Sequence, residues 1–346
     1  MRGLGWKVNK LLGLALLLLL GRIISLAPLA LEVPYRGFEG REHLVRIPKG
    51  ATGAQIADSL ARQGVIRWPL YFELLIRWHG AGAELQAGTY AFSKESTPRE
   101  VLRRLIEGDV VKQNFVVPEG SNSYDIARAF AQAGLGSEQQ FLNAAKATYL
   151  IADLDPEATD LEGYLFPDTY QVVLGESAME LVKKMVGQFR QQLSGGLLGW
   201  LRVEGRSLRE VVTLASLVEE ETGVAEERAL IAAVFLNRLR HGIRLQCDPT
   251  VLFALQRAGR SGRELSRADL EFPSTYNTYL RAGLPPGPIA SPGRASLEAA
   301  LQPASVPYLY FVAGPDGGHR FSATLEEHNR QVFSTRRQRR ASERDG

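Results

Sequence analysis

A long apolar stretch opens the chain. The 21 residues of Leu11–Leu31 carry a single charge, at Arg22, and they follow the basic residues Arg2, Lys7 and Lys10. A helix of this length spans about 32 Å, close to the ~30 Å hydrocarbon core of a bilayer. The pattern therefore predicts a transmembrane anchor at 11–31, with a cytoplasmic N-terminus at 1–10 and the rest of the chain outside. The alternative is a cleaved signal peptide with Leu11–Leu20 as its apolar region.

The next pattern occurs twice, at an offset of 70 residues. Val45–Gly50 and Phe115–Gly120 align as a short strand followed by a Pro-x-Gly turn. The match continues through a polar helix start, a single apolar stripe and a glycine stop, with the pairs Ile56/Ile126, Ala57/Ala127, Leu60/Phe130, Ala61/Ala131 and Gly64/Gly134. Each copy is predicted to form a strand and an amphipathic helix.

Between the copies, Gly88–Phe92 reads as a strand, and a helix is predicted to begin with Thr97 as N-cap, Pro98 at the first position and Glu100 at the third, and to end at Gly108. The strand and helix of each copy resemble part of a LysM module, which binds the sugar backbone of peptidoglycan. The alternative is a generic βα packing element. We therefore expect a small LysM-like α/β unit at 34–112.

Ser207–Thr222 is the segment with the clearest candidate chemistry. Ser207 and Glu210 form a predicted capping box, and the helix continues through apolar residues into Glu219, Glu220 and Glu221. With about 100° per residue and Leu208 at zero, Glu219 falls at about 20°, inside the apolar stripe. Burial and the helix C-terminus both raise the pKa of a carboxyl group, as a general acid requires. The alternative is a structural acid paired with Arg228 or Arg238.

Composition narrows the chemistry further. The chain has 346 residues, 45% of them hydrophobic, and a net charge of +3, so disorder is excluded and a nucleic-acid partner is not indicated. Cys247 is the single cysteine, and the five histidines show no i, i+4 pair. We therefore expect no disulfide, no metal and no cofactor. A peptidase or amidase is disfavoured, because neither a zinc spacing nor a Gly-x-Ser-x-Gly motif occurs.

Several segments, taken in order along 45–332, together resemble the endolytic murein transglycosylase (YceG-like) family. They are Leu161–Tyr170, Ala215–Thr222, Phe235–Leu239, Gln246–Val251, Tyr276–Tyr279, Gly283–Pro292, Tyr308–Ala313, Gly318-His319 and His328-Asn329. The resemblance implies a lyase that cuts nascent glycan strands internally, between N-acetylmuramic acid and N-acetylglucosamine, and leaves 1,6-anhydro ends. It places the catalytic glutamate in the Ala215–Thr222 segment, where the first glutamate of the family pattern corresponds to Glu219.

Such a lyase needs one carboxyl group, because the substrate supplies the nucleophile, whereas ordinary glycosidases use two. Gln246, Asp248, Tyr276 and Asn277 are the candidates to hold the sugar or to orient Glu219. Cys247 stands where the family often has threonine. Expected partners are peptidoglycan glycan strands, the membrane through a single span and, by resemblance only, cell-wall elongation synthases. A membrane-tethered, peptidoglycan-binding adaptor without catalysis is the alternative function.

The expected architecture is α+β: the anchor, the LysM-like unit, a larger mixed α+β catalytic domain at 113–333 and a basic tail at 334–346. The expected location is the cytoplasmic membrane, with the C-terminal domain on its outer, periplasmic side.

Overall fold

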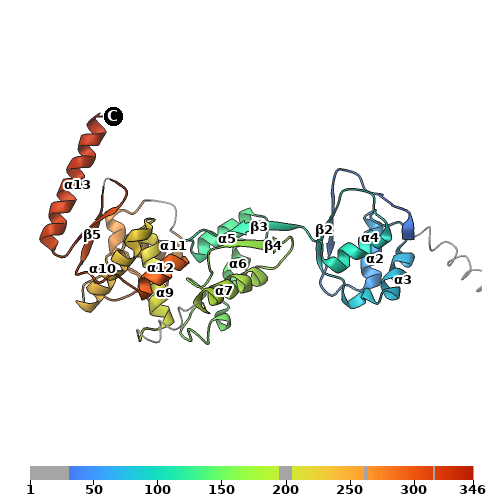
Figure 1. The fold of residues 1–346 in the computed structure, drawn as a ribbon, viewed down its shortest axis with the longest axis horizontal. Helices are drawn as coiled ribbons and strands as arrows, with labels where there is room; N and C mark the ends of the chain where they lie inside the picture. The colour runs from blue at the N-terminus through green and yellow to red at the C-terminus, as the bar shows by residue number, and fades with distance from the viewer. Residues whose placement is uncertain (1–30, 195–204, 261–263, 315, 346) are drawn as a thin grey trace, which may run out of the picture. The chain divides into compact units, whose positions relative to one another are not determined.

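The computed structural model describes residues 31–194, 205–260, 264–314 and 316–345. Within these ranges no helix combines the length and the apolar character needed to cross a membrane. The predicted cytoplasmic segment at 1–10 and all but the last residue of the predicted anchor lie outside the described residues. Helices and small sheets are mixed along the chain (Figure 1), which confirms the α+β class.

The described residues divide into two compact units. The first unit comprises 31–113 together with Gln171–Glu176, and the second comprises Asn114–Tyr170 together with the residues from Ser177 onward. The helices and strands of the first unit are β1 (His43–Ile47), α2 (Gly53–Arg62), α3 (Pro69–Trp78), β2 (Gly88–Phe92) and α4 (Pro98–Glu107).

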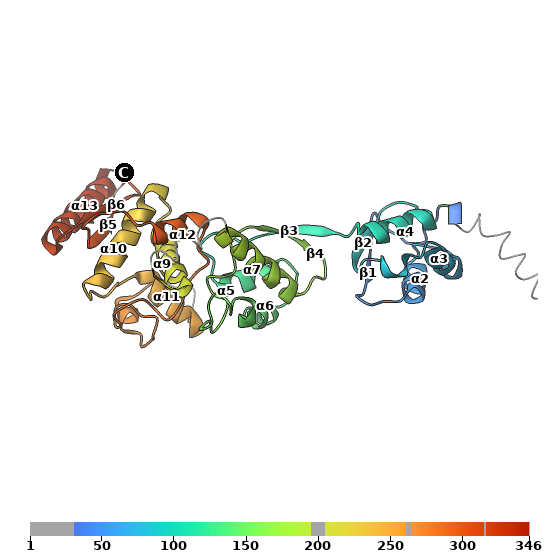
Figure 2. The ribbon, with the colours of Figure 1, turned by 60° about the horizontal axis from the view of Figure 1, so that its bottom comes forward.

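The elements that follow are β3 (Lys112–Val116), α5 (Ser123–Gln132), α6 (Glu138–Ala144), β4 (Thr169–Val173), α7 (Ala178–Ser194), α9 (Leu208–Glu221), α10 (Arg228–Arg240), α11 (Asp248–Arg257), α12 (Arg294–Leu301), β5 (Tyr310–Ala313), β6 (His319–Ser322) and α13 (Leu325–Asp345). Figure 2 shows the same elements from a second direction. The strands pair two by two, as β1–β2, β3–β4 and β5–β6. The predicted basic tail is helical as far as Asp345, as the end of α13.

Local signals in the first unit specify its elements closely. Thr97 and Glu100 form the predicted capping box of α4, and Gly108 ends the helix with φ +66°, so both predicted ends are confirmed. The predicted strand at Gly88–Phe92 is confirmed as β2, which pairs antiparallel with β1 so that Ile47 lies opposite Gly88. The inward faces of these elements form one core, with Val45, Phe72 and Leu105 fully buried among its members.

The sequence repeat is a repeat of structure, and it is longer than the sequence pattern indicated. The helices α2 and α5 have the same bounds at an offset of 70, and each begins with a capping box, at Thr52 and at Asn122. The turn glycines Gly50 and Gly120 have φ of +81° and +79°. Each copy continues with a second helix, a strand that pairs with the first, and a third helix. The order β-α-α-β-α therefore occurs twice, as β1-α2-α3-β2-α4 and as β3-α5-α6-β4-α7.

The helix α9 is the central helix of the second unit. It packs against α10, α11 and α12, and every residue from Val211 to Val218 is buried. The sequence pattern suggested an amphipathic helix, but Thr213 and Ser216 on its predicted polar side are also buried. Ser216 meets its hydrogen-bonding needs by donating to the Thr213 carbonyl at 2.7 Å and accepting from the Ile289 N–H at 3.1 Å. Only the first and last turns of α9 can therefore present charged groups.

A buried glutamate supports the start of α5. Glu162 is 2% exposed and accepts from the Ser123 N–H at 3.0 Å and from the Ser123 hydroxyl at 2.6 Å. A carboxylate is favoured at a helix N-terminus. Burial is the stronger effect here and raises the pKa of Glu162 to about 7.

This pKa predicts a pH dependence of stability. Folded Glu162 binds a proton more tightly than unfolded Glu162, so its contribution is complete below pH ~4.5 and is lost as pH rises to about 7. The loss is on the order of 3 kcal/mol. Urea unfolding of Glu162→Gln should show a weaker decline in stability between pH 5 and 7 than the native chain. The control is Glu157→Gln, an exposed glutamate on the same loop. Parallel pH profiles for the native chain and Glu162→Gln would contradict the assignment.

Candidate active site

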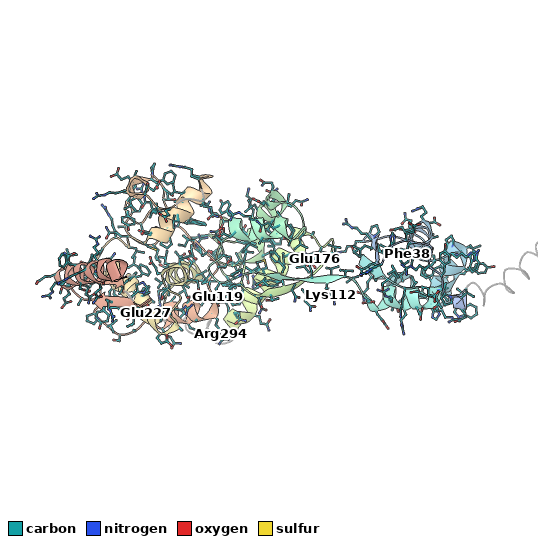
Figure 3. The ribbon with its side chains drawn as sticks, turned by 90° about the horizontal axis from the view of Figure 1, so that it is seen from above. Phe38, Lys112, Glu119, Glu176, Glu227 and Arg294 are labelled. Atoms are coloured by element: carbon teal, nitrogen blue, oxygen red, sulfur yellow. The ribbon has the colours of Figure 1, made fainter. Side chains whose placement is uncertain are left out.

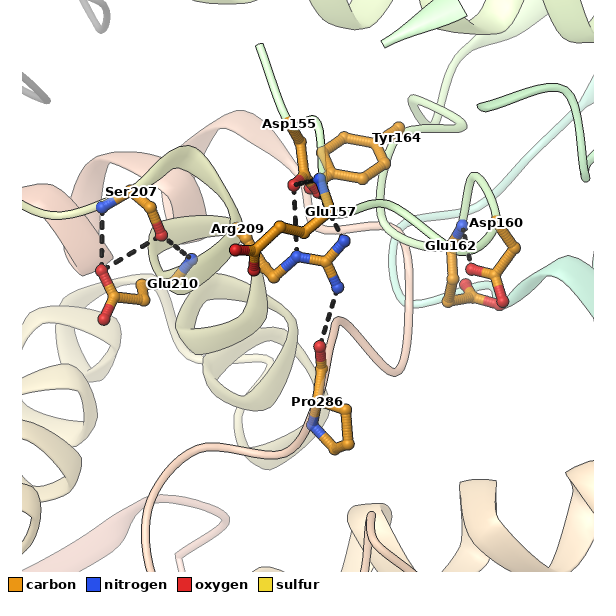
Figure 4. Close-up of polar contacts among 9 residues, drawn as sticks. All are labelled: Asp155, Glu157, Asp160, Glu162, Tyr164, Ser207, Arg209, Glu210 and Pro286. Carbon is orange, nitrogen blue, oxygen red and sulfur yellow. Dashed lines mark hydrogen bonds and ion pairs between the residues drawn. The ribbon is translucent and has the colours of Figure 1, made fainter. Parts of the chain in front are cut away.

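The first turn of α9 is held firmly, which fixes the position of its last turn. The predicted capping box is confirmed, because the Ser207 side chain accepts from the Glu210 N–H and Glu210 accepts from the Ser207 N–H. Arg209 forms an ion pair with the buried Asp155 at 3.0 Å and donates to the Pro286 carbonyl at 2.8 Å (Figure 4). The Arg209 guanidinium thus joins two loops to the start of α9.

Glu219 is buried beside an arginine. Its side chain is 6% exposed, and its Oε2 accepts from the Gly293 N–H at 2.9 Å. The Arg228 guanidinium, also largely buried, lies 3.4 Å from Oε1 and donates to the Ser296 hydroxyl as well. Of the two arginines named as alternative partners from the sequence, Arg228 is the one that pairs with Glu219. This geometry is that of a structural acid, and no contact among the described residues tests a catalytic role for Glu219.

The Pro-x-Gly turn of the second repeat lies next to Glu219. Gly120 donates to the Ser291 carbonyl at 3.0 Å, and the Ser291 N–H donates to Ser121. The Glu119 carboxylate lies directly over the α-carbon of Gly293, where a β-carbon would be 1.9 Å from Oε1. Glu119 and Arg294 are seen close together in Figure 3. Main chain and charged side chains are therefore among the neighbours of Glu219.

Glu221, two residues further along α9, faces a cavity. Two residues correspond to about 200° of helix rotation, so Glu219 and Glu221 point in nearly opposite directions. The cavity has a volume of about 330 Å³. It is lined by Glu221, Phe235, Arg238, Leu245, Gln246, Asp248, Tyr279, Phe311 and His328. A concave site with a few convergent polar groups is the usual form of a binding or active site.

Burial is the main influence on the acidity of Glu221. It raises the pKa of this carboxyl group, and the negative charge of Asp248 raises it further. A hydrogen bond with the Cys247 thiol and the positive charges of His319 and Arg238 act in the opposite direction without cancelling the rise. The direction of this shift is the one that the sequence analysis required of a general acid.

The other polar groups of the cavity are held in fixed orientations. Arg238 donates to the carbonyls of Leu309 and Leu245 at 2.7 and 2.8 Å. The Tyr279 hydroxyl donates to Asp248 at 2.5 Å. Gln246 has φ +50°, a left-handed conformation that is rare for a residue other than glycine and that often marks functional sites.

His328 and Glu227 add two further features of this region. Burial, followed by the nearby charge of Arg238, lowers the pKa of His328, so this ring is biased toward its neutral form. Glu227, labelled in Figure 3, accepts from the His319 N–H at 2.7 Å and lies 2.7 Å from its ring Nδ1. The Glu227 contacts tie β6 to the segment that follows α9.

The structure brings two of the four predicted substrate contacts to the cavity. Gln246 and Asp248 line it, whereas Tyr276 and Asn277 are not among its lining residues. Tyr276 packs edge-on against Phe253 and under Arg257. Asn277 is fully buried and donates to the carbonyls of Leu270 and Phe272, so it shapes the turn that carries Tyr279.

Sequence reasoning missed four polar residues of the cavity: Glu221, Arg238 as a cavity group, Tyr279 and His328. A signal for Glu221 was present, since the helical wheel places it at about 220°, between Leu217 and Leu214 on the apolar flank. The signals for the other three lay only in the segments that carry the family resemblance. No group of three or more His, Cys, Asp or Glu side chains within the described ranges could hold a metal ion.

The fold is mixed α+β, and the cavity holds Glu221, an acid with a raised pKa, among polar side chains. The sequence model of the YceG-like family matches residues 45–334, and the chain belongs to this family. An endolytic murein transglycosylase of Bacillus subtilis is 34% identical over 302 residues, which cover 83% of this chain and 82% of that protein.

An endolytic murein transglycosylase of Streptococcus pneumoniae is 30% identical over 320 residues, and here the chain spans only 57% of the relative's length. The crystal structure of a YceG-like protein from Listeria monocytogenes superposes with a TM-score of 0.57 at 32% identity. That alignment covers 84% of this chain and 99% of the Listeria chain.

The ion pair of Glu219 predicts a cost in stability. Glu219→Gln removes the charge opposite a buried guanidinium, so we expect the free energy of unfolding to fall by about 1–3 kcal/mol. Chemical denaturation measures this change. Glu226→Gln, which alters an exposed glutamate shortly after α9, is the control and should be nearly neutral. Equal stabilities of Glu219→Gln and the native chain would show that the pair with Arg228 contributes nothing.

Proposed function

We propose that this protein is a lytic murein transglycosylase of the cell envelope. It cleaves the β-1,4 bond between N-acetylmuramic acid and N-acetylglucosamine within nascent glycan strands and so ends strand elongation. The names of the relatives support this role. The observation that carries it in this chain is the 330 Å³ cavity, in which a buried acid with a raised pKa lies among oriented polar groups.

Within this proposal Glu221 is the general acid and base. Protonated Glu221 donates its proton to the glycosidic oxygen as the bond from that oxygen to C1 of the muramic residue breaks. The C6 hydroxyl of the same residue then attacks C1, and its proton returns to the Glu221 carboxylate. No water is consumed, the product carries a 1,6-anhydro ring, and the enzyme ends in its starting state. One carboxyl group is sufficient for this sequence.

The neighbours of Glu221 have separate roles in the proposal. Gln246 and Asp248 hold sugar hydroxyl or amide groups, because their side chains line the cavity. Tyr279 fixes the orientation of Asp248 through its hydrogen bond. Arg238, held by main-chain carbonyls, places a fixed positive charge near Glu221, which stabilises the carboxylate formed after proton donation.

The prediction of Glu219 as the catalytic acid stays open beside this proposal. The sequence favours Glu219, and the cavity favours Glu221. Because the two side chains point in nearly opposite directions, a single bound sugar linkage contacts only one of them.

The proposal also retains the architecture expected from the sequence. It comprises a single-pass anchor at 11–31, a sugar-binding LysM-like unit at 34–112, a catalytic domain at 113–333 and a location outside the cytoplasmic membrane. The repeated β-α-α-β order is compatible with the LysM-like interpretation, and a cell-wall location agrees with the names of the relatives. Association with elongation synthases rests on the family resemblance alone.

Variants of Glu219 and Glu221 test both the proposed activity and the identity of the general acid. On purified glycan strands, the native chain should release fragments with anhydro ends that borohydride cannot reduce, as read by mass spectrometry. Glu221→Gln should lower the rate by about 10²–10⁴ while leaving the fold intact by circular dichroism.

The Glu219→Gln variant decides between the two glutamates. It should retain most activity at a temperature where it is folded. The reverse result, with Glu219→Gln inactive and Glu221→Gln active, would assign the acid to Glu219. Co-sedimentation of the native chain with sacculi in the absence of products would favour the non-catalytic adaptor.

The Cys247 thiol provides a test of how the acid is tuned. Its hydrogen bond lowers the pKa of Glu221, so Cys247→Ala should raise that pKa and move the alkaline limb of the activity profile to higher pH. Cys247→Ser retains a donor and serves as the control, with a smaller displacement of the limb. A limb that stays in place in Cys247→Ala, with the native rate at low pH, would contradict the role of the thiol.

A further inference from the structure

The helix α3 carries an exposed apolar stripe. Leu70, Leu74 and Trp78 are spaced by four residues, lie on successive turns and are 55%, 43% and 88% exposed. The opposite face of the helix, with Phe72 and Ile76, is buried in the core of the first unit. Single exposed apolar residues are common on protein surfaces, but a continuous row on one helix face marks a contact surface.

The internal repeat shows that the fold does not require this stripe. The equivalent helix of the second copy is α6, in which Phe141 is fully buried like Phe72. From this second helix onward the offset is 69, because α3 starts at Pro69 and α6 at Glu138. Leu70 and Leu74 then correspond to Gln139 and Asn143, which form an exposed i, i+4 hydrogen bond at 3.0 Å. One structural element thus carries a polar pair in one copy and an apolar pair in the other. The apolar pair therefore serves a contact outside the unit.

The surroundings of the stripe fit a membrane surface. Trp68 and Tyr71 pack edge-on at the start of α3, and the Arg67 guanidinium lies 5.1 Å from the centre of the Trp68 ring. Arg77, 73% exposed and paired with Glu73 at 2.6 Å, is the penultimate residue of the helix and lies beside the stripe. Tryptophan and tyrosine concentrate at the level of lipid headgroups, and arginine is attracted to anionic lipids. A helix with an apolar face and basic flanks lies in the plane of such an interface.

The start of the described chain places this helix near the predicted anchor. Leu31, the last residue of the apolar stretch at 11–31, packs directly against the core of the first unit, so no linker separates that stretch from the unit. Glu32 pairs with Arg99 of α4 at 2.6 Å. In Figures 1 and 2, α3 and the blue start of the described chain lie at the same end of this unit. A bilayer that holds 11–31 would lie at this end.

We propose that α3 docks on the outer surface of the membrane, with Leu70, Leu74 and Trp78 inserted at the level of the headgroups and Arg67 contacting anionic phosphates. The contact fixes the orientation of the first unit on the bilayer. It does not depend on the proposed catalytic activity, since none of these residues lines the cavity around Glu221.

The test uses the full chain reconstituted in vesicles of phosphatidylglycerol and phosphatidylcholine. A fluorophore sensitive to its environment is attached at Arg77→Cys, beside the stripe, and headgroup-level nitroxide lipids serve as quenchers. The matched control is Lys146→Cys, an exposed basic position just after α6. The native chain, whose single Cys247 is buried, gives the labelling background. We expect blue-shifted emission and strong quenching at position 77 and neither change at position 146.

The second variant transfers the polar pair of α6 to α3. Leu70→Gln with Leu74→Asn, in the Arg77→Cys background, should lose most of the quenching while keeping the fold and the rate on soluble glycan strands. Unchanged quenching in this variant would overturn the proposal, because the label would then be near lipid only through the anchor. A label whose emission does not respond to lipid but is shielded by added glycan strands would also overturn the proposal. That result would show a sugar-binding surface instead.

Discussion

The burial of the whole middle of α9, from Val211 to Val218, is the constraint on which the second unit depends. A helix surrounded on all sides by other elements has no room for charge along its middle, so its polar groups must be satisfied locally, as those of Ser216 are. The capping box at one end and the Arg209 ion pair fix the rotation of the helix about its axis. Because the helix cannot rotate about its axis, the environment of each glutamate in its last turn is fixed.

The environments of Glu219 and Glu221 differ in how they compensate the cost of burying a carboxyl group. At Glu219 the compensation is a guanidinium and a main-chain N–H that contact the two carboxylate oxygens. At Glu221 burial and the negative charge of Asp248 raise the pKa of the carboxyl group, and Arg238, which donates to main-chain carbonyls, offsets this rise only in part. An acid paired with a buried arginine suits a structural role, whereas an acid with a raised pKa beside a cavity suits proton transfer.

Repetition of one β-α-α-β-α element gives the chain its two different surfaces. Capping boxes, turn glycines and the buried phenylalanines of α3 and α6 are common to both copies, because the backbone demands them. The outward residues are free to differ, as Leu70 and Gln139 do. In the second copy the Pro-x-Gly turn carries Glu119 to the neighbourhood of α9, whereas the same turn of the first copy carries Lys49. The two copies thus share one backbone arrangement but present different side chains to their surroundings.

The sequence by itself determined the elements whose signals are local. The ends of α4 and the capping box of α9 follow from residues within a few positions of one another, whose hydrogen bonds do not depend on distant segments. The strand β2 and the repeat follow from residue types that can be read along the chain. Gln246 and Asp248 were found because they belong to a compact motif.

The tertiary structure alone decided which glutamate faces an open volume. A helical wheel assumes that one side of a helix is buried and the other is exposed. The wheel ranked Glu219 above Glu221 because Glu219 falls on the apolar side. The middle of α9 has no exposed side, so this criterion does not distinguish the two glutamates. The cavity joins residues from α9, α10, α11, β5 and α13 and from two loops, and its first and last residues, Glu221 and His328, are 107 positions apart in the chain. Such a meeting depends on how helices pack, and no periodicity within one segment carries that information.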